Sequence, residues 1–358
     1  MRKSAIVIGF GAFFLTMALL LKFYAYDKLA VIPMDQNTGQ VAVDKNAYLF
    51  DAGTLKFQRT TLTTQITAVV DKKASEDYGK NAVIFNKNQF STIPQTKTPQ
   101  QAVTEHFAVD RHTAKTLNCC NDSQNGKPVN HEGYTVKFPF SVDKNSTYPY
   151  WDASIQKPMD MKYAGTDKIK GLTVYRFEGS VPRQTLVSTP KKEAPGFLFG
   201  GAQDSPGVNA DWTYAVDRTI WVEPQTGAFI KVGEAQKQWL TDPKSNKSVQ
   251  VLTTNSIFDD ATVQKNVDDY KTKAMQLKAL KLAPWILGIL GILLLIGGVI
   301  LAALVGRNRA QGRHGADDDY AGEYDDGEYD DTVAYDPDET QGGDTGLRSS
   351  RRAARDDG

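Results

Sequence analysis

One stretch constrains this chain more than any other. Residues 282–305 read LAPWILGILGILLLIGGVILAALV and contain no charged side chain. A helix of that length, rising 1.5 Å per residue, crosses a hydrocarbon layer of about 30 Å and satisfies its own backbone groups there. Trp285 lies at its front edge, and three arginines follow it: Arg307, Arg309 and Arg313. An interfacial aromatic and a positive flank are typical of a transmembrane helix, so we predict one over 282–305.

The amino terminus carries a second apolar run. Arg2 and Lys3 precede residues 4–21, which hold no charge. This pattern is typical of a signal anchor or of a cleaved secretory peptide. No small-x-small cleavage site follows, because large or charged residues occupy that place: Lys22, Phe23, Tyr24 and Tyr26. We predict an uncleaved transmembrane anchor over residues 1–25.

Two spans place both termini on one side of the membrane. The charges that flank the second span do not decide the orientation, since four lysines precede it and three arginines follow it. The Arg2-Lys3 start decides the orientation, because charges that belong to a long translocated domain count for little. We therefore expect a plasma-membrane protein with cytoplasmic termini and a large extracytoplasmic domain.

The segment between the spans has the pattern of β-strands. Apolar and polar residues alternate over 61–70, and again over 134–142, where Pro139 indicates an edge strand or a bulge. Residues 220–232 have the pattern of a hairpin, with Pro224 and Gly227 in its turn. The expected class is mainly β (antiparallel, α+β), in an extracytoplasmic domain over residues 26–259 between two transmembrane helices.

Two segments depart from this pattern. Residues 188–210 contain seven prolines and glycines, which predict a long loop with an apolar tip at Phe197, Leu198 and Phe199. Residues 260–281 place apolar side chains at spacings of three and four, which predicts a juxtamembrane amphipathic helix. We expect a break near Pro284 between this helix and the span at 282–305.

The chain ends in a segment of unusual charge. Residues 317–344 carry thirteen carboxylates and no lysine or arginine, so the rest of this formally neutral chain has an excess of 13 positive charges. High charge and few aliphatic residues predict a cytoplasmic, disordered acidic tail over 306–358. Three threonines among the carboxylates are candidate phosphorylation sites: Thr332, Thr340 and Thr345.

Three blocks resemble a known family. They are HEGYTVKFPFSVDKNSTYPYWD at 131–152, GLTVYRFE at 171–178 and WVEPQTG at 221–227. Their order resembles an actinobacterial family of two-span envelope proteins labelled a domain of unknown function or "porin PorA family". The resemblance runs from the first span through the second and implies a plasma-membrane protein, with some members linked to lipoglycan assembly. A porin strand needs a lipid-facing apolar band, whereas two helical anchors already explain membrane attachment here.

The sequence offers little for catalysis. Cys119 and Cys120 are adjacent, and in an oxidising compartment they predict a disulfide, with redox sensing or pairing to another chain as alternatives. No nucleophile motif, phosphate loop, dinucleotide fingerprint or HExxH zinc motif occurs. Neither histidine nearest the cysteine pair has a zinc-ligand spacing to it. We expect no enzyme activity, no cofactor, no metal and no nucleic-acid partner.

Two groups of residues are candidates for ligand binding. Tyr148, Tyr150 and Trp151 beside Asp152 could stack on a sugar and accept its hydroxyl hydrogen bonds, although aromatics in an alternating strand more often belong to the core. The tip at 197–199 could contact lipid, as a lid or a wedge, or fold back onto the core. We expect the outer domain to bind a membrane lipid or lipid-linked glycan and to support envelope (lipoglycan) assembly.

Two alternatives to lipid binding stay open. One is a structural or regulatory subunit that contacts envelope-assembly proteins. The other is the porin-like protein that the family label suggests. A cavity of several hundred Å³ in the β domain would favour ligand binding, whereas a solid core would favour the structural role.

Overall fold

A computed structural model describes residues 2–187, 189 and 191–311 of the 358-residue chain. The chain divides into two compact units, residues 1–302 and residues 303–358. Of the second unit, only residues 303–311 are described, and they are helical. The predicted tail with Thr332, Thr340 and Thr345 therefore lies outside the described residues.

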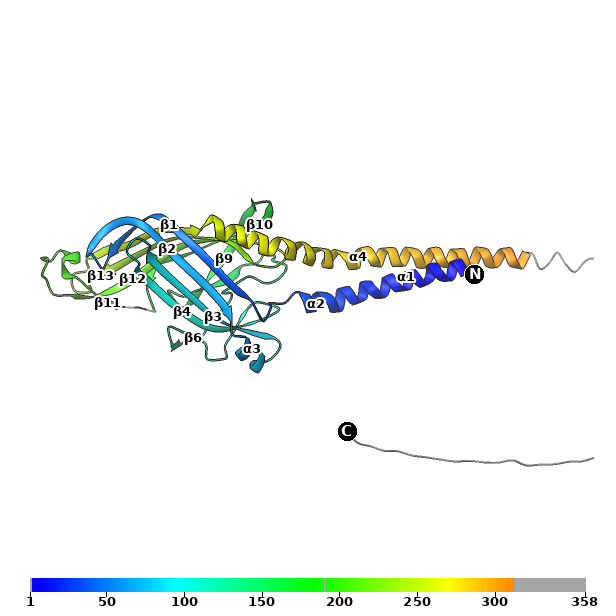
Figure 1. Ribbon diagram of the computed structural model, residues 1–358, viewed down its shortest axis with the longest axis horizontal. Helices are drawn as coiled ribbons and strands as arrows, with labels where there is room; N and C mark the ends of the chain where they lie inside the picture. Colours follow the sequence, from blue (N-terminus) through cyan, green and yellow to red (C-terminus); the bar gives the residue numbers. More distant parts are fainter. Residues whose placement is uncertain (1, 188, 190, 312–358) are drawn as a thin grey trace, which may run out of the picture. The chain divides into compact units, whose positions relative to one another are not determined.

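The first unit contains one large antiparallel sheet (Figure 1). Its first part holds seven strands: β1 (Asn37–Asp51), β2 (Lys56–Val70), β3 (Ala82–Ile93), β4 (Thr98–Asp110), β5 (Thr116–Leu117), β6 (Ser123–Gln124) and β7 (Lys127–Pro128). Its second part holds seven more: β8 (Tyr148–Asp152), β9 (Lys157–Ile169), β10 (Leu172–Thr185), β11 (Lys191–Ala194), β12 (Val208–Val222), β13 (Phe229–Thr241) and β14 (Ser248–Phe258). Both parts are meanders, and the pairing of β1 with β14 joins them into one sheet.

Helices add little to this domain. Within its described residues, α3 (Lys72–Tyr78) is a short helix that Asp71 caps by accepting a hydrogen bond from the backbone N–H of Ala74 at 3.0 Å. η2 (Gly196–Phe199) is a single 3₁₀ turn. The antiparallel β class is confirmed, whereas the α+β description is not.

The alternating segments have different outcomes. β2 contains the predicted strand at 61–70, and β12 and β13 form the predicted hairpin at 220–232. Gly227 in its turn has φ +73°, and a Cβ there would lie 2.1 Å from the carbonyl oxygen of Phe138. The prediction of a strand over 134–142 is wrong: that segment forms only isolated bridges at Tyr134 and Lys137. Tyr134 makes two backbone hydrogen bonds with β8, whereas Phe138, Ser141 and Val142 donate to turn residues at 224–227, so no continuous ladder forms.

Side chains hold the two ends of the sheet together. In the strand order, β4 lies near one end and β8 at the other. Trp151 on β8 nevertheless donates from Nε1 to Oε1 of Glu105 on β4 at 3.0 Å. Gln124 on β6 also donates from Nε2 to the carbonyl of Ala153, just beyond β8, at 2.8 Å. The sheet therefore curls until its ends meet through side chains rather than through a backbone ladder.

The main core lies on the inner side of the curled sheet. Large aromatic residues from both halves fill it: Phe85, Phe107, Phe138, Phe177 and Tyr214 are nearly free of solvent contact. Phe138 stacks on Tyr148 with 4.6 Å between ring centroids. The irregular segment after His131 thus supplies aromatic anchors that hold β8 against the sheet.

The last helix, α4 (Asp260–Gln311), is continuous. Its first turns pack on the sheet through Val263 and Val267, and Asn266 donates from Nδ2 to the carbonyl of Ile230 at 3.0 Å. Residues 260–281 are helical, as their spacing predicts, but the expected break near Pro284 is absent. A proline removes one helical hydrogen bond, and the long helix on both sides of it tolerates that loss.

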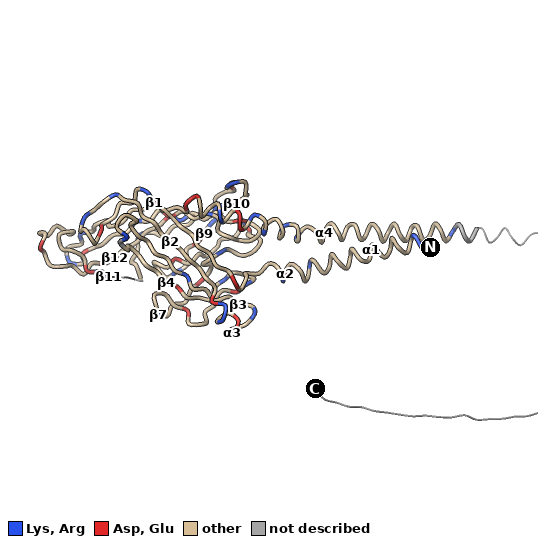
Figure 2. Tube along the Cα trace, viewed as in Figure 1, with Lys and Arg blue, Asp and Glu red and all other residues tan. Residues whose placement is uncertain are grey.

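A second apolar helix lies beside α4 in the first unit. α1 (Arg2–Leu20) continues through one turn of π-helix, η1 (Leu21–Ala25), into α2 (Tyr26–Leu29). Both helical segments are long and apolar enough to cross a membrane, and most of their side chains are exposed. Residues 4–21 and 282–305 of these helices carry no charge, and charged side chains lie on either side of each run (Figure 2).

Candidate functional site

A cavity of about 310 Å³ lies inside the curled sheet. Strands β1 to β4 form one wall, and β12, β13 and β14 form much of the other. Because side chains alternate along a strand, every second residue of each strand points inward. The register thus selects which residues line the cavity.

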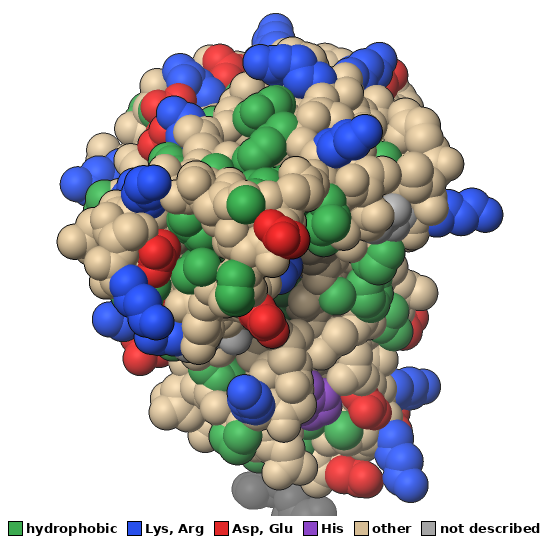
Figure 3. All heavy atoms as spheres, turned by 90° about the vertical axis from the view of Figure 1, so that its left-hand side faces the viewer, with side chains coloured by type: hydrophobic (Ala, Val, Ile, Leu, Met, Phe, Trp, Pro, Cys, Tyr) green, Lys and Arg blue, Asp and Glu red, His purple; other side chains and the backbone are tan. Residues whose placement is uncertain are grey.

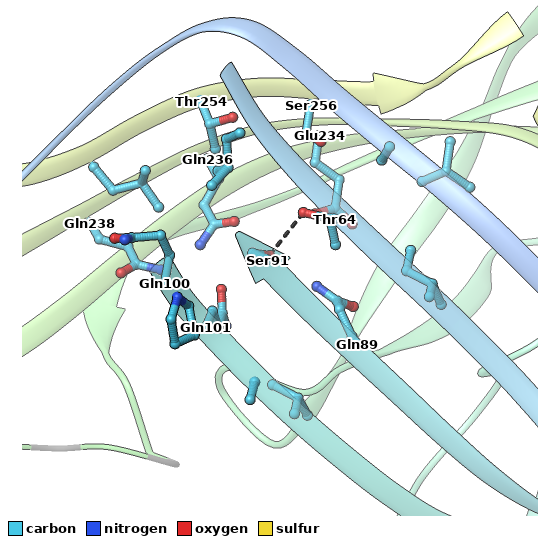
Figure 4. A pocket seen from close by; sticks show the side chains of 18 of the residues that line it. Thr64, Gln89, Ser91, Gln100, Gln101, Glu234, Gln236, Gln238, Thr254 and Ser256 are labelled. Atoms are coloured by element: carbon cyan, nitrogen blue, oxygen red, sulfur yellow. Dashed lines mark hydrogen bonds between the residues drawn. The ribbon is translucent and has the colours of Figure 1, made fainter. Parts of the chain in front are cut away.

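Polar side chains, all but one of them neutral, form a belt around the cavity. On β13 and β14, Gln236 lies opposite Thr254, and Glu234 lies opposite Ser256. On β2 and β3, the hydroxyl oxygens of Thr64 and Ser91 are hydrogen-bonded at 2.8 Å. Figure 4 shows these side chains converging with other labelled lining residues: Gln89, Gln100, Gln101 and Gln238. We call this set the polar belt.

Several buried polar atoms that line the cavity lack partners. Within the described residues, no hydrogen bond reaches Thr135 Oγ1, Trp212 Nε1, Gln236 Nε2 or Ser256 Oγ. Buried polar atoms in proteins are almost always paired, and an unpaired one destabilises the fold by about 1–3 kcal/mol. A ligand with hydroxyl groups would satisfy both the donors and the acceptors among them.

The charged groups near the belt are already paired within the protein. Lys87 Nζ lies 2.8 Å from Glu105 Oε2. Arg218 donates from Nε to Glu234 at 2.8 Å and from Nη1 to Asp152 at 3.0 Å. Around the belt the cavity wall therefore has little unbalanced charge, and an uncharged polar molecule matches it better than an ion.

The lining includes residues near both ends of β1, at 38–42 and 49–50, together with Gln36 and Ala52 just beyond them. At the end near α4, Gln36 donates to the hydroxyl of Tyr270 at 3.5 Å. Burial and the neighbouring Asp269 raise the pKa of Tyr270 to about 12, so this hydroxyl stays protonated. The opposite end of the domain is hollowed near its centre, with hydrophobic and charged side chains around the hollow (Figure 3). The cavity thus reaches from the helix end of the domain toward its far end.

The apolar tip at 197–199 closes part of that far end. Phe199 is only 6% exposed and packs with Leu240 and Val251, so it belongs to a core cluster. Leu198 lines the cavity, and the ring of Phe197 lies 6.3 Å from that of Phe50. One tip residue therefore folds into the core and another faces the cavity, and lipid contact by 197–199 stays a prediction.

The aromatic group at 148–152 is mostly internal. Tyr148, Trp151 and Asp152 are each at most 5% exposed, and Asp152 pairs with Arg218. Of the group, Tyr150 lines the cavity. Glycan binding by these four residues stays a prediction, and the structure offers Tyr150 alone to a ligand in the cavity.

The remaining candidate residues lie elsewhere. Cys119 and Cys120 form a disulfide with their Cα atoms 3.8 Å apart, and neither lines the cavity. Among the described residues, no cluster of histidine, cysteine and carboxylate side chains has a metal-binding arrangement.

Sequence reasoning missed the polar belt. Its signal was present: Glu234, Gln236 and Gln238 alternate with Ala235 and Lys237, so polar residues occupy both faces of one strand. Such a strand has no apolar side to identify as inward. Only the register of β13 against β14 and β12 determines which of these residues face the cavity.

The fold and the cavity together define a class: an antiparallel β domain with a polar internal cavity, carried on two apolar helices. The family model described as Porin PorA matches residues 3–300, and the chain belongs to that family. The resemblance expected from the three sequence blocks is therefore confirmed.

Two curated relatives are similar to this chain. A protein named Porin PorA from Corynebacterium resistens is 26% identical over 247 residues, which cover 52% of this chain and 59% of the relative. Another Porin PorA, from Corynebacterium amycolatum, is 23% identical over 249 residues, which cover 55% of this chain and 64% of the relative. The chain thus matches less than two thirds of each relative. These names agree with the porin-like alternative more than with lipid binding.

Proposed function

We propose that this chain is a non-enzymatic, membrane-anchored envelope protein whose β domain takes up hydrophilic, hydroxyl-rich solutes as a step in their passage through the envelope. The observation that carries this proposal is the polar belt with its unpaired buried atoms. The relatives' name, Porin PorA, supports passage of solutes as the purpose of the cavity.

The polar outer face of the sheet limits how such passage works. Leu62, Thr64 and Ile66 of β2 line the cavity. The residues that alternate with them face outward, and all are polar: Thr61, Thr63, Gln65 and Thr67. A strand that faces lipid needs apolar side chains there. We infer that α1 and α4 carry the membrane attachment and that the β domain receives solute in water.

A second candidate is the binding of a lipid-linked glycan. Apolar side chains lie beyond the polar belt toward both ends of the cavity, among them Ile66, Phe258, Leu240 and Leu252. A molecule with a glycan part and an apolar part would match this division. This candidate would make the chain a carrier in envelope lipoglycan assembly rather than a channel component.

Liposome swelling tests the first candidate. The full chain is reconstituted and challenged with glucose, sucrose and raffinose. Solute passage predicts swelling that slows with sugar size, and Gln236→Leu should reduce it severalfold because it makes the belt apolar. Gln65→Leu is the matched control, since Gln65 lies on the outer face of β2.

Lipid extraction and mass spectrometry of the same purified chain test the second candidate. Swelling without a stoichiometric glycolipid supports passage. A glycolipid at about one per chain without swelling supports the carrier. If neither is observed, both functions are wrong.

A further inference from the structure

The two apolar helices pack closely over one stretch and separate over another. A Cβ added to Gly11 of α1 would lie 2.9 Å from the carbonyl oxygen of Gly291 on α4, and one added to Gly298 would lie 2.5 Å from Ile8 Cγ1. Glycines at such contacts let helix backbones approach closely in membranes. Nearer the β domain, the helices leave a groove of about 240 Å³ between them.

The groove is apolar along its length and basic at one end. Leu15 and Leu19 of α1 face Ile289 and Ile292 of α4 across it. At Gly288 an added Cβ would have a single neighbour within 4 Å, the Cβ of Ala18 at 3.9 Å, so two small residues keep the groove open.

Lys22 lies at the basic end of the groove. Its Nζ is 5.0 Å from the centroid of the Trp285 ring. Among the ion pairs of the described residues, none includes Lys22. A second cation, Lys281, precedes Trp285 by one helical turn and donates to Ser141 Oγ at 2.9 Å. The hydroxyl of Tyr26 shares that serine at 2.8 Å.

This arrangement has the two parts of a lipid site. An apolar groove accepts an acyl chain, and a lysine beside an interfacial tryptophan lies at the depth of the headgroups. Asp27 is the nearest carboxylate along the chain, and it is exposed and followed by Lys28. The local charge therefore favours an anionic headgroup over a zwitterionic one.

We propose that the groove between α1 and α4 binds one anionic phospholipid, with an acyl chain between Leu15 and Ile292 and the phosphate at Lys22, within reach of Lys281. The lipid would lie in the leaflet on the side of the β domain. Its occupancy would fill the space between the helices and fix their separation at this level. This proposal rests on the two helices spanning the bilayer and is independent of the cavity in the β domain.

Lipid retention by the full chain tests this proposal. The chain is reconstituted in vesicles of equal parts phosphatidylglycerol and phosphatidylcholine with identical acyl chains, then extracted in mild detergent. Retained lipid per chain is counted by mass spectrometry. We expect about one phosphatidylglycerol per chain and little phosphatidylcholine. Lys22→Gln should weaken phosphatidylglycerol retention about fivefold, since each lysine near an anionic surface contributes about that factor.

Gly288→Leu should abolish retention by filling the groove. Gly297→Leu is the matched control, because a Cβ at Gly297 has no neighbour within 4 Å. Lys271→Gln is the charge control, at an exposed position two turns or more before the groove.

Three results would overturn the proposal. Equal retention of the two lipids would mean binding of bulk lipid only. Equal loss in Gly288→Leu and Gly297→Leu would mean a general effect on the membrane helices. A chain dimer that forms without lipid and is lost in Gly288→Leu would mean that a second copy occupies the groove. If Gly288→Leu does not fold, the Lys22→Gln measurement decides alone.

Discussion

Glu105 on β4 accepts a hydrogen bond from the indole of Trp151 on β8, and this contact joins strands near opposite ends of the sheet. The same carboxylate binds Lys87 at 2.8 Å and His131 at 3.1 Å, and His131 also pairs with Asp122. All of these side chains are buried or nearly so. One buried charged cluster therefore connects β3, β4 and β8 with Asp122, just before β6, and His131, just after β7.

We expect Glu105→Ala to be strongly destabilising. Removal of one member of a buried ion pair leaves its partners uncompensated and costs about 3–5 kcal/mol. The measurement is thermal unfolding of the full chain in detergent, followed by circular dichroism in the β region. Glu178→Ala is the control, since Glu178 pairs with Arg176 on an exposed face, where pairs contribute about 0–1 kcal/mol. Equal melting temperatures for the two variants would contradict a closing role for the cluster.

The same cluster predicts a pH optimum for stability. Burial opposes ionisation of Glu105, but Lys87 and His131 outweigh it and lower the pKa of Glu105 to about 2. Burial also opposes protonation of His131, but hydrogen bonds to Asp122 and Glu105 outweigh it and raise the pKa of His131. The contribution of Glu105 is present above its ordinary pKa of 4.5 and is lost as the pH falls toward 2.

The contribution of His131 has the opposite sign. It is complete below the ordinary pKa of 6.5 and is lost as the pH rises through the raised folded value. We expect the melting temperature to be highest between about pH 4.5 and 6.5. His131→Asn should flatten the alkaline side of the profile and reduce the acid side without removing it, because Lys87 still lowers the pKa of Glu105. If the melting temperature of His131→Asn fell at alkaline pH as much as that of the unaltered chain, other groups would cause the alkaline loss of stability.

Lys137 is a buried amine whose removal should stabilise the domain. It is 6% exposed, and its Nζ has no hydrogen-bond partner among the described residues and lies 3.2 Å from the centroid of the Phe140 ring. Burial lowers the pKa of Lys137 well below 10.5, so folding at neutral pH works against its protonation. Lys137→Met keeps the stem and removes the amine.

We expect Lys137→Met to raise the free energy of unfolding by about 1–3 kcal/mol. Lys157→Met, at an exposed position, should change it by no more than about 0.5 kcal/mol. Thermal unfolding at pH 7 measures both. A lower melting temperature in Lys137→Met would mean that the amine has a stabilising role.

The residues of the apolar tip at 197–199 differ in their surroundings: Phe199 lies in the core and Leu198 lines the cavity. Phe199 is buried, so Phe199→Ala should cost about 3–5 kcal/mol, and the Phe197→Ala, Phe199→Ala double variant should melt much earlier. Leu198→Ala should leave the melting temperature nearly unchanged, because Leu198 is only half-buried and faces the cavity. If the double variant kept its melting temperature and lost bound lipid, the tip would be a lid instead.

The orientation of the chain has a direct test. Cys119 and Cys120 lie in the β domain and are partly exposed. With the domain outside, a membrane-impermeant thiol reagent should label them in reduced, intact spheroplasts. Unreduced cells should show no labelling, because the two thiols form a disulfide. Labelling that requires permeabilised membranes would reverse the orientation.

Local patterns in the sequence determined the apolar helices and several of the strands of this protein. The uncharged run at 282–305 is sufficient for an apolar helix, because its length and composition alone match a bilayer. Alternation over 61–70 and the Pro-Gly turn at 224–227 determined strands in the same way, since their signals lie within a few residues of each other. The continuity of α4 through Pro284 did not follow from the sequence. Proline is a local signal for a helix break, whereas the stability of α4 comes from the long helical segments on both sides of Pro284.

Tertiary structure alone decided how the sheet closes and what the closed sheet contains. Glu105, His131 and Trp151 are separated by up to 46 positions along the chain, and no periodicity relates them. Gln236 and Ser256 became lining residues through the register of β13 on β14, in which a shift of one residue would turn the polar belt outward. Pairing between residues far apart in the sequence sets both features. A charge buried between distant strands is stable only when all of its hydrogen-bond and ion-pair partners are in place.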